Sequence, residues 1–459
     1  MKLVTTKYKL VENALFLVFW VLAVYNCIVQ ELTGAENHTV DLLGRLFGQG
    51  MLILLGLWTL RKKTDIAVIA VFCLFTLIGT CWVNGHGLFV WVDGLRLYVG
   101  FLFLPPIIRY LLSDKELWTG FVARMDRNLY RFLWLQFPVM IIERLHYYNL
   151  DLIGGTLGYM HSGIISNLIY LISFYLMLRQ WDKSKGYLEN LREHWVLILL
   201  LFPSLLNETK VSFIFLLMYF FLLVPMDRKF IKRILWIAPL IVVAFMGALY
   251  VYSQSLGGKA GDMEDMASMT KYVIGDEAAL NAVEWTMERE MMDENAEVQD
   301  LIRGLKFVIM PAIMDRNPPA WVWGYGLGLY KIGDAAQGHP YAKRYQWLMM
   351  GTMMQGLLFW LEVGLVGVAM YLLYFPLELR LFKRRLPRSK QLQWFLGVNA
   401  LLIGFYNSAF LSLPFCIIFI YMMLVSSIWD TLPPYKPVKI LGSRPINWSL
   451  KEKKEAPQG

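Results

Sequence analysis

A series of long apolar runs constrains this chain more than any other feature of its sequence. Each run holds about 20 mostly apolar residues, the length that a helix rising about 1.5 Å per residue needs to cross a hydrocarbon layer of about 30 Å. The runs occupy positions 12–30, 42–60, 66–83, 88–112, 132–148, 162–178, 191–206, 211–225, 234–252, 361–379, 392–411 and 412–429. They predict an all-α polytopic membrane protein with about twelve transmembrane helices.

The composition excludes the other broad classes of protein. Hydrophobic residues make up 57% of the chain and charged residues 17%, whereas ordinary soluble domains are about 45–50% apolar. A soluble enzyme of this length would need a more polar surface, and a disordered chain would lack such runs. The four cysteines all lie inside apolar runs, so they are expected to be small buried side chains rather than a disulfide framework or a zinc site.

The basic residues predict the orientation of the spans, because lysine and arginine are retained in cytoplasmic loops. They concentrate in alternate loops, at 2–9, 61–63, 115–131, 183–192, 228–233 and 380–390. The intervening short loops 31–41, 84–87, 149–161 and 207–210 hold a single basic residue, Lys210. This alternation places both termini in the cytoplasm. It also accounts for the net charge of +9 through contact with the lipid bilayer rather than with nucleic acid.

Four regions follow from this topology. Residues 1–252 form a transmembrane region of about nine spans, and 346–429 form a second one of about three. Residues 253–345 lie outside the membrane and carry more acidic than basic side chains. A loop of this length greatly exceeds the usual connection, and its apolar spacing predicts helices within it, so we expect a large, partly helical external loop. Residues 430–459 form a basic cytoplasmic tail.

Charged residues near the outer face are candidates for function, since ionisable groups inside or beside a membrane are costly unless they are paired or hydrated. Lys210 forms either a local surface pair with Glu208 or an external cation that binds a phosphate. Asp93 and Arg96 are three positions apart in one span. They form either a structural ion pair or a site in which Arg96 faces a cavity and meets a charged ligand.

The segment from 303 to 344 holds further candidates. Its arginines are Arg303, Arg316 and Arg344, which are candidate cations of the site, and His339 is a candidate general base. Gly324, Gly326 and Gly328 lack the spacing of a nucleotide-binding loop, and we expect them to let the backbone approach a neighbour or a ligand closely. Beyond the segment, Glu362 lies among apolar residues and needs a partner. No metal-binding motif occurs, so we expect neither a metal nor another cofactor.

These residues resemble the hallmark region of the O-antigen polymerase and O-antigen ligase superfamily. The resemblance rests on Gly324-Tyr325-Gly326-Leu327-Gly328, on His339, and on the later run Leu361-Glu362-Val363-Gly364-Leu365-Val366-Gly367, beside a large periplasmic loop. Arg303 matches the upstream arginine of that pattern, Lys210 stands where the family has an arginine, and residues 154–158 resemble another glycine patch. His339 precedes Glu362 by 23 positions, which is more than the usual spacing.

The resemblance implies a GT-C-like glycosyltransferase of the bacterial inner membrane. Its substrate would be an oligosaccharide linked to undecaprenyl diphosphate, and transfer would be metal-independent and would invert the sugar's anomeric centre. Lys210, Arg303 and other cations would neutralise the departing diphosphate, while His339 would accept the proton of the acceptor hydroxyl. Protein partners would be a chain-length regulator or other polysaccharide-assembly proteins.

Three functions remain open at this point. A polymerase would join O-antigen, capsule or exopolysaccharide repeat units, and a ligase would transfer the finished polymer to lipid A-core or another acceptor. A transporter would bind the same lipid-linked glycan without chemistry. A transporter is expected to carry paired repeats and charges near the membrane midplane, whereas the charges here gather at the outer face.

Overall fold

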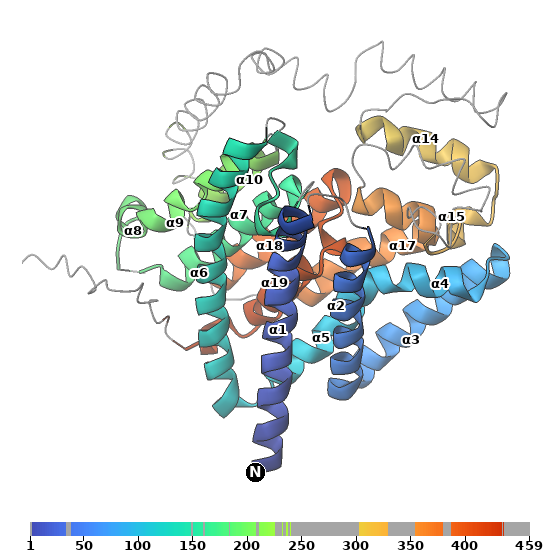
Figure 1. Cartoon of the computed structure of the whole chain (residues 1–459), viewed down its shortest axis with the longest axis horizontal. Coiled ribbons are helices and arrows are strands. Elements are labelled where there is room, and N and C mark those ends of the chain that lie inside the picture. The colour runs from blue at the N-terminus through green and yellow to red at the C-terminus, as the bar shows by residue number, and fades with distance from the viewer. Residues whose placement is uncertain are drawn as a thin grey trace, which may run out of the picture.

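The computed structural model of the chain describes residues 2–33, 38–147, 150–158, 161–182, 184–207, 211–224, 303–328, 354–379, 387–433 and 435, with single positions at 232, 236 and 239. These residues are almost all helical, and no strand occurs among them. The predicted all-α class is therefore confirmed for the described part of the chain. The N-terminus and α14 lie at opposite ends of the molecule (Figure 1).

The first part of the chain forms ten α-helices joined by short connections. They are α1 (Lys2–Thr33), α2 (His38–Thr59), α3 (Lys63–Leu77), α4 (Leu88–Leu95), α5 (Val99–Leu111), α6 (Lys115–His146), α7 (Ser162–Gln180), α8 (Tyr187–Glu193), α9 (Trp195–Leu199) and α10 (Val211–Leu222). Among the connections are a π-helical turn, η1 (Ile78–Val83), and the 3-10 turns η2 (Arg96–Tyr98), η3 (Leu150–Leu152), η4 (Gly155–Leu157) and η5 (Phe202–Leu205).

The second part of the chain contributes five described α-helices. They are α14 (Arg303–Asp315), α15 (Ala320–Trp323), α17 (Gln355–Leu379), α18 (Pro387–Tyr406) and α19 (Leu413–Ser426), with the 3-10 turns η8 (Ala409–Leu411) and η9 (Trp429–Thr431). Of the predicted external loop 253–345, only α14, α15 and the segment up to residue 328 lie in the described ranges.

Among the described residues, six helical segments are long and apolar enough to cross a membrane. They are Thr5–Val29, Leu42–Thr59, Lys63–Val83, Leu88–Leu111, Ser162–Gln180 and Gln355–Pro376. Six of the predicted runs thus correspond to candidate membrane spans, in agreement with a protein embedded in a membrane. The predicted run 234–252 lies outside the described residues, apart from single positions.

Other predicted spans differ from a single membrane-crossing helix, among them the runs 191–206 and 412–429. The run 191–206 is divided between α8, α9 and η5, where Pro203 has no backbone N–H to continue an α-helix. The run 412–429 becomes α19, whose 14 residues are all buried. At about 1.5 Å per residue this helix is shorter than the hydrocarbon layer, and it lies inside the protein.

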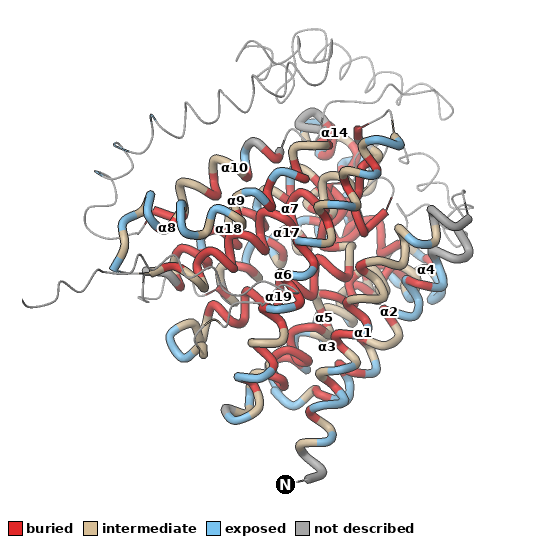
Figure 2. The backbone as a smooth tube through the Cα atoms, turned by 60° about the vertical axis from the view of Figure 1, so that its left-hand side comes forward, coloured by how far each residue is buried: buried red, intermediate tan, exposed pale blue. Residues whose placement is uncertain are grey.

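The core surrounds α7 and α19, where buried backbone segments gather in Figure 2. Aromatic side chains fill much of it, such as the rings of Phe174 and Phe395, which stack with centroids 4.0 Å apart. Two pairs of polar side chains in this core bond each other. Asn167 and Asn399 bond each other through their side-chain amides, and Arg179 forms an ion pair with Asp126 at 3.2 Å. These contacts fix α7 against α18 and α6.

Candidate functional site

A break in α17 lies at the centre of the candidate site. Gly364 has φ 70° and ψ −166° inside this helix, a conformation that is essentially restricted to glycine. The break interrupts the regular pattern in which a carbonyl accepts a hydrogen bond from the residue four positions later. The carbonyl oxygens of Leu361 and Glu362 accept hydrogen bonds from another segment instead.

That segment is the glycine strip, residues 324–328, which follows α15. Tyr325 donates its N–H to the carbonyl oxygen of Leu361 at 2.7 Å, and Gly326 donates to that of Glu362 at 3.2 Å. Gly324, Gly326 and Gly328 all have positive φ. The strip therefore takes over the hydrogen bonds that the break in α17 leaves open.

The contact between strip and helix requires glycine on both sides. A Cβ added to Gly324 would lie 2.3 Å from the carbonyl carbon of Glu362, and one added to Gly364 would lie 2.6 Å from that of Val322. Both clashes are with backbone atoms, which cannot move aside as a flexible side chain can. The expectation that these glycines allow a close backbone approach is met by a neighbouring segment of the protein itself.

Glu362 is 1% exposed, and both of its carboxylate oxygens accept hydrogen bonds. Its Oε2 accepts a hydrogen bond from the Tyr98 hydroxyl at 2.6 Å, and its Oε1 accepts one from the Gly328 N–H at 2.8 Å. Charge-assisted hydrogen bonds of this kind offset part of the cost of burying a carboxylate. Glu362 thus joins α17, the glycine strip and the turn η2.

The turn η1 and the residues after it form the other wall of the strip. Leu327 donates its N–H to the Thr80 hydroxyl oxygen at 2.9 Å, and the Asn84 amide donates to the carbonyl oxygen of Gly324 at 2.9 Å. The buried His86 donates from Nε2 to the carbonyl oxygen of Tyr325 at 3.0 Å, which fixes a proton on that nitrogen. With the bond from Gly324 N–H to Ala320, every backbone N–H of the strip has a protein acceptor.

Cations lie close to this unit. Arg96, in η2, forms an ion pair with Asp93, so the pair predicted from the sequence is present. Arg45 of α2 is a further cation, and it lines a cavity with residues of α1, α7 and α19. Sequence reasoning did not single out Arg45. Its position at the outer end of a predicted span, where basic residues are rare, is the same signal that identified Lys210.

The other predicted site residues are placed only in part. Arg316 is exposed just after α14, and Arg303 begins α14, with its side chain outside the described set. Lys210, Glu208, His339 and Arg344 lie outside the described residues. The structure therefore joins Gly324, Gly326, Gly328 and Glu362 into one unit with Arg96 nearby. Their contact with substrate, and the roles of the remaining residues, stay predictions.

The second glycine patch, residues 154–158, is held against the C-terminal part of α6. Glu143, which is 5% exposed, accepts a hydrogen bond from the Gly155 N–H at 2.7 Å. Gln136 accepts one from the Thr156 N–H at 3.0 Å and donates to its hydroxyl at 2.8 Å. These bonds give the patch a fixed place beside α1 and α7.

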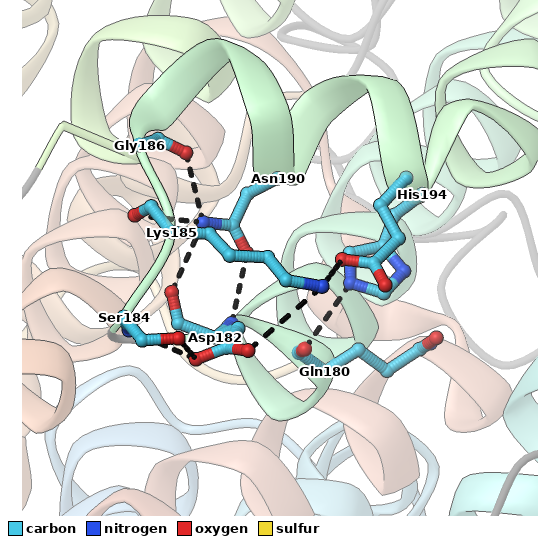
Figure 3. A network of polar contacts seen from close by, with 8 residues as sticks. Gln180, Asp182, Ser184, Lys185, Gly186, Asn190 and His194 are labelled. Atoms are coloured by element: carbon cyan, nitrogen blue, oxygen red, sulfur yellow. Dashed lines mark hydrogen bonds and ion pairs between the residues drawn. The ribbon is translucent and has the colours of Figure 1, made fainter. Parts of the chain in front are cut away.

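A separate polar network surrounds α8 (Figure 3). Asn190, fully buried, donates to the carbonyl oxygens of Asp182, Lys185 and Gly186 and accepts from the Asp182 N–H. The hydrogen bond from Lys185 to Glu193 raises the pKa of the Lys185 ammonium group. The contacts close a loop before α8, and we assign them a structural role.

An apolar cavity of about 430 Å³ lies between α3, α5 and α17. Tyr98 and Phe359 are among its lining residues, and Val68 and Leu373 are exposed there. The cavity therefore reaches Tyr98, whose hydroxyl binds Glu362. It connects an apolar surface of the membrane helices to the unit formed by the glycine strip and α17.

Neither a metal centre nor a known relative identifies the chemistry of this site. Within the described ranges, no group of three or more His, Cys, Asp or Glu side chains is placed to hold a metal ion. In comparisons with known proteins, the chain matches no protein-family model and no curated protein.

Proposed function

We propose that this protein is a membrane glycosyltransferase that takes glycan from an undecaprenyl-diphosphate-linked donor at the periplasmic face. Its reaction would polymerise O-antigen, capsule or exopolysaccharide repeat units. The observation that carries the proposal is the contact between the two segments on which the family resemblance rests. The glycine strip and the broken helix α17 bond each other through Tyr325 and Gly326, so motifs that are separate in the sequence form one structural unit.

The proposed topology has about twelve spans in the bacterial inner membrane, with both termini cytoplasmic. The positions of the basic loops support this orientation. So does the separation of the N-terminus from α14, which lie at opposite ends of the molecule (Figure 1). The glycine strip, Asn84 and Arg96 then belong to the periplasmic side, where the head group of a lipid-linked donor is accessible.

The proposed chemistry depends on positive charge beside the departing diphosphate. When the sugar is transferred, negative charge grows on the leaving phosphate, and nearby guanidinium or ammonium groups stabilise that charge. We assign this role to Lys210 and Arg303, with support from Arg96. His339 would accept the proton of the acceptor hydroxyl as the new glycosidic bond forms.

The apolar cavity between α3, α5 and α17 suits the isoprenoid chain of such a donor. Its volume is about 430 Å³, and its lining is aromatic and aliphatic, with hydroxyl groups on Tyr98, Tyr371 and Tyr374. The Tyr98 hydroxyl already binds Glu362, and the Tyr371 hydroxyl already donates to the carbonyl oxygen of Ala400. An isoprenoid chain needs no polar partner, and its burial is favourable in proportion to the apolar area covered. The chain would thus lie next to the carboxylate that holds the glycine strip.

Transfer by purified protein tests the proposal. The full chain in lipid nanodiscs would receive a defined undecaprenyl-diphosphate-linked repeat unit, and products would be sized by gel. We expect lengthened lipid-linked glycan from the wild type and from Arg192→Ala, a control on the exposed face of α8. Lys210→Ala and Arg303→Ala should abolish it, and His339→Ala should slow it strongly. Near-normal glycan from both cation variants would contradict the diphosphate-binding role.

The same reaction separates the alternative functions. Transfer to lipid A-core with no growth of the lipid-linked glycan would identify a ligase instead of a polymerase. Movement of intact lipid-linked glycan across the membrane of sealed vesicles, with no new glycosidic bond, would identify a transporter.

A further inference from the structure

Four of the candidate membrane spans end close together, toward the end of the molecule that holds the N-terminus (Figure 1). They are Thr5–Val29, Leu42–Thr59, Lys63–Val83 and Leu88–Leu111. Lys7 of α1 donates from Nζ to the carbonyl oxygen of Trp58 in α2 at 3.0 Å, and the Tyr8 hydroxyl donates to that of Leu111 in α5 at 2.8 Å. Because the ends of spans lie at the level of the lipid head groups, the side chains gathered here are placed at that level.

Two cations share one aromatic ring at this place. The Lys7 ammonium nitrogen lies 5.6 Å from the centroid of the Tyr110 ring, and the Arg61 guanidinium carbon lies 4.9 Å from it. The Lys7 ammonium nitrogen also lies 4.7 Å from the ring centroid of Trp58. Cation–π contacts attract a positive charge but do not neutralise it. The rings therefore hold two positive charges near each other, in a group that we call the Lys7–Arg61 site (Lys7, Trp58, Arg61 and Tyr110).

Neither cation of the site forms an ion pair with a carboxylate in the described part of the chain. The bond to the Trp58 carbonyl uses one of the three ammonium donors of Lys7 and leaves its charge in place. Arg61 is exposed and Lys7 is half-buried, so a ligand can reach both. Two like charges held near each other repel, and an anion that contacts both removes that repulsion.

The carboxylates near these residues in the sequence are engaged elsewhere. Their partners are Arg124 for Glu12, Arg109 for Asp65, and the Glu116 N–H for Asp114. The two residues that follow Arg61 are lysines, Lys62 and Lys63, and both are exposed. The surroundings of the site thus add positive charge and do not supply the missing anion.

We propose that the Lys7–Arg61 site binds the head group of an anionic glycerophospholipid. The phosphate accepts hydrogen bonds from the Lys7 ammonium and the Arg61 guanidinium groups. Trp58, which is 46% exposed, packs beside the glycerol and the upper acyl chains, as tryptophan does at membrane interfaces. A choline head group carries its own cation, which the two protein cations repel, so the site prefers a head group with net negative charge. The inference does not depend on glycosyl transfer.

Native mass spectrometry of the purified full chain tests the lipid preference. The protein is titrated in turn with phosphatidylglycerol and with phosphatidylcholine that carry the same acyl chains. We expect phosphatidylglycerol to bind at least about fivefold more tightly. Equal binding of the two lipids would overturn the proposal. Displacement of bound phosphatidylglycerol by inorganic phosphate at the same concentration would indicate a site for a soluble anion and would overturn the assignment to a lipid.

Substitutions separate this site from the general attraction of a basic surface for anionic lipid. Lys7→Gln and Arg61→Gln should each weaken phosphatidylglycerol binding by about fivefold, and the double variant should bind the two lipids equally. Arg61 is exposed, so Arg61→Gln remains informative even if Lys7→Gln folds poorly.

The matched control is Lys9→Gln, which removes one positive charge from an exposed position of the same helix, α1. It should bind phosphatidylglycerol like the wild type. Unchanged affinity in Arg61→Gln would contradict the proposed contact. An equal loss in Lys9→Gln and Arg61→Gln would show that total charge, and not this site, determines binding, and would also overturn the proposal.

Discussion

The contact between the glycine strip and α17 makes a sharp prediction about Gly364. Alanine at this position must adopt φ 70° and ψ −166°, which costs about 1–3 kcal/mol for a residue with a side chain. Its Cβ would also lie 2.6 Å from the backbone of Val322. Moving the strip away to relieve that clash would weaken the hydrogen bonds donated by Tyr325 and Gly326, each worth about 0.5–1.5 kcal/mol.

Together these terms predict that Gly364→Ala destabilises the protein by about 2–6 kcal/mol. The control is Gly50→Ala, because Gly50 lies within α2 and a Cβ there would meet nothing within 4 Å. Alanine in the middle of a helix is favoured over glycine by about 0.5–1 kcal/mol, so Gly50→Ala should be neutral or slightly stabilising. Equilibrium unfolding of both variants in mixed detergent micelles measures the difference.

A double variant tests whether one contact is responsible. Gly324→Ala should also be destabilising, since its Cβ would meet the backbone of Glu362 at 2.3 Å. Because Gly324 and Gly364 belong to the same contact, the double variant should cost clearly less than the sum of the two single variants. Equal stability of Gly364→Ala and Gly50→Ala, or strictly additive losses, would refute the reasoning.

Three further changes are predicted from buried polar pairs, each measured by the same unfolding assay. Tyr98→Phe removes a hydrogen bond to the buried Glu362 carboxylate and should cost about 1.5–3 kcal/mol. Asp126→Leu leaves its buried arginine partner without a counter-charge and should cost about 3–5 kcal/mol. Asn167→Leu removes the hydrogen-bond partner of the Asn399 side-chain amide and should lower the free energy of unfolding by about 1–3 kcal/mol. Adding Asn399→Leu should recover much of that loss, and a double variant weaker than either single one would contradict the pairing.

The helical class and several spans could be predicted from the sequence because a membrane imposes a simple length and polarity on each crossing segment. Interior helices are harder to recognise, since a buried helix is as apolar as a membrane span. α19 has the hydropathy of a span, but its 14 residues make it shorter than the hydrocarbon layer, so the predicted span 412–429 stays unconfirmed. The change from α9 to η5 within the run 191–206 is consistent with Pro203, which cannot donate a backbone hydrogen bond and which a hydropathy average does not take into account.

The candidate site was predictable in its residue types but not in its contacts. The apolar neighbours of Glu362 in the sequence indicate that its carboxylate needs a hydrogen-bond donor. That Tyr98 is this donor can be known only from the tertiary structure. The close backbone approach at Gly324 was expected, and its target, the break at Gly364, was not. Arg45, in contrast, could have been identified from the sequence alone, because basic residues are rare at the predicted outer ends of spans.

The hydrogen bonding of the glycine strip limits where reacting groups can come from. Each backbone N–H from Gly324 to Gly328 already has a protein acceptor, and both oxygens of Glu362 already accept hydrogen bonds. A substrate phosphate could use these donors only by displacing bonds that hold α17, η1 and the strip together. In the proposed reaction, the donors for a phosphate would therefore be side chains outside the strip, such as those of Arg96 in η2 and of Arg303 at the start of α14. Under the proposed function, the strip would act as a support, and the cations around it would supply the charge that a departing diphosphate requires.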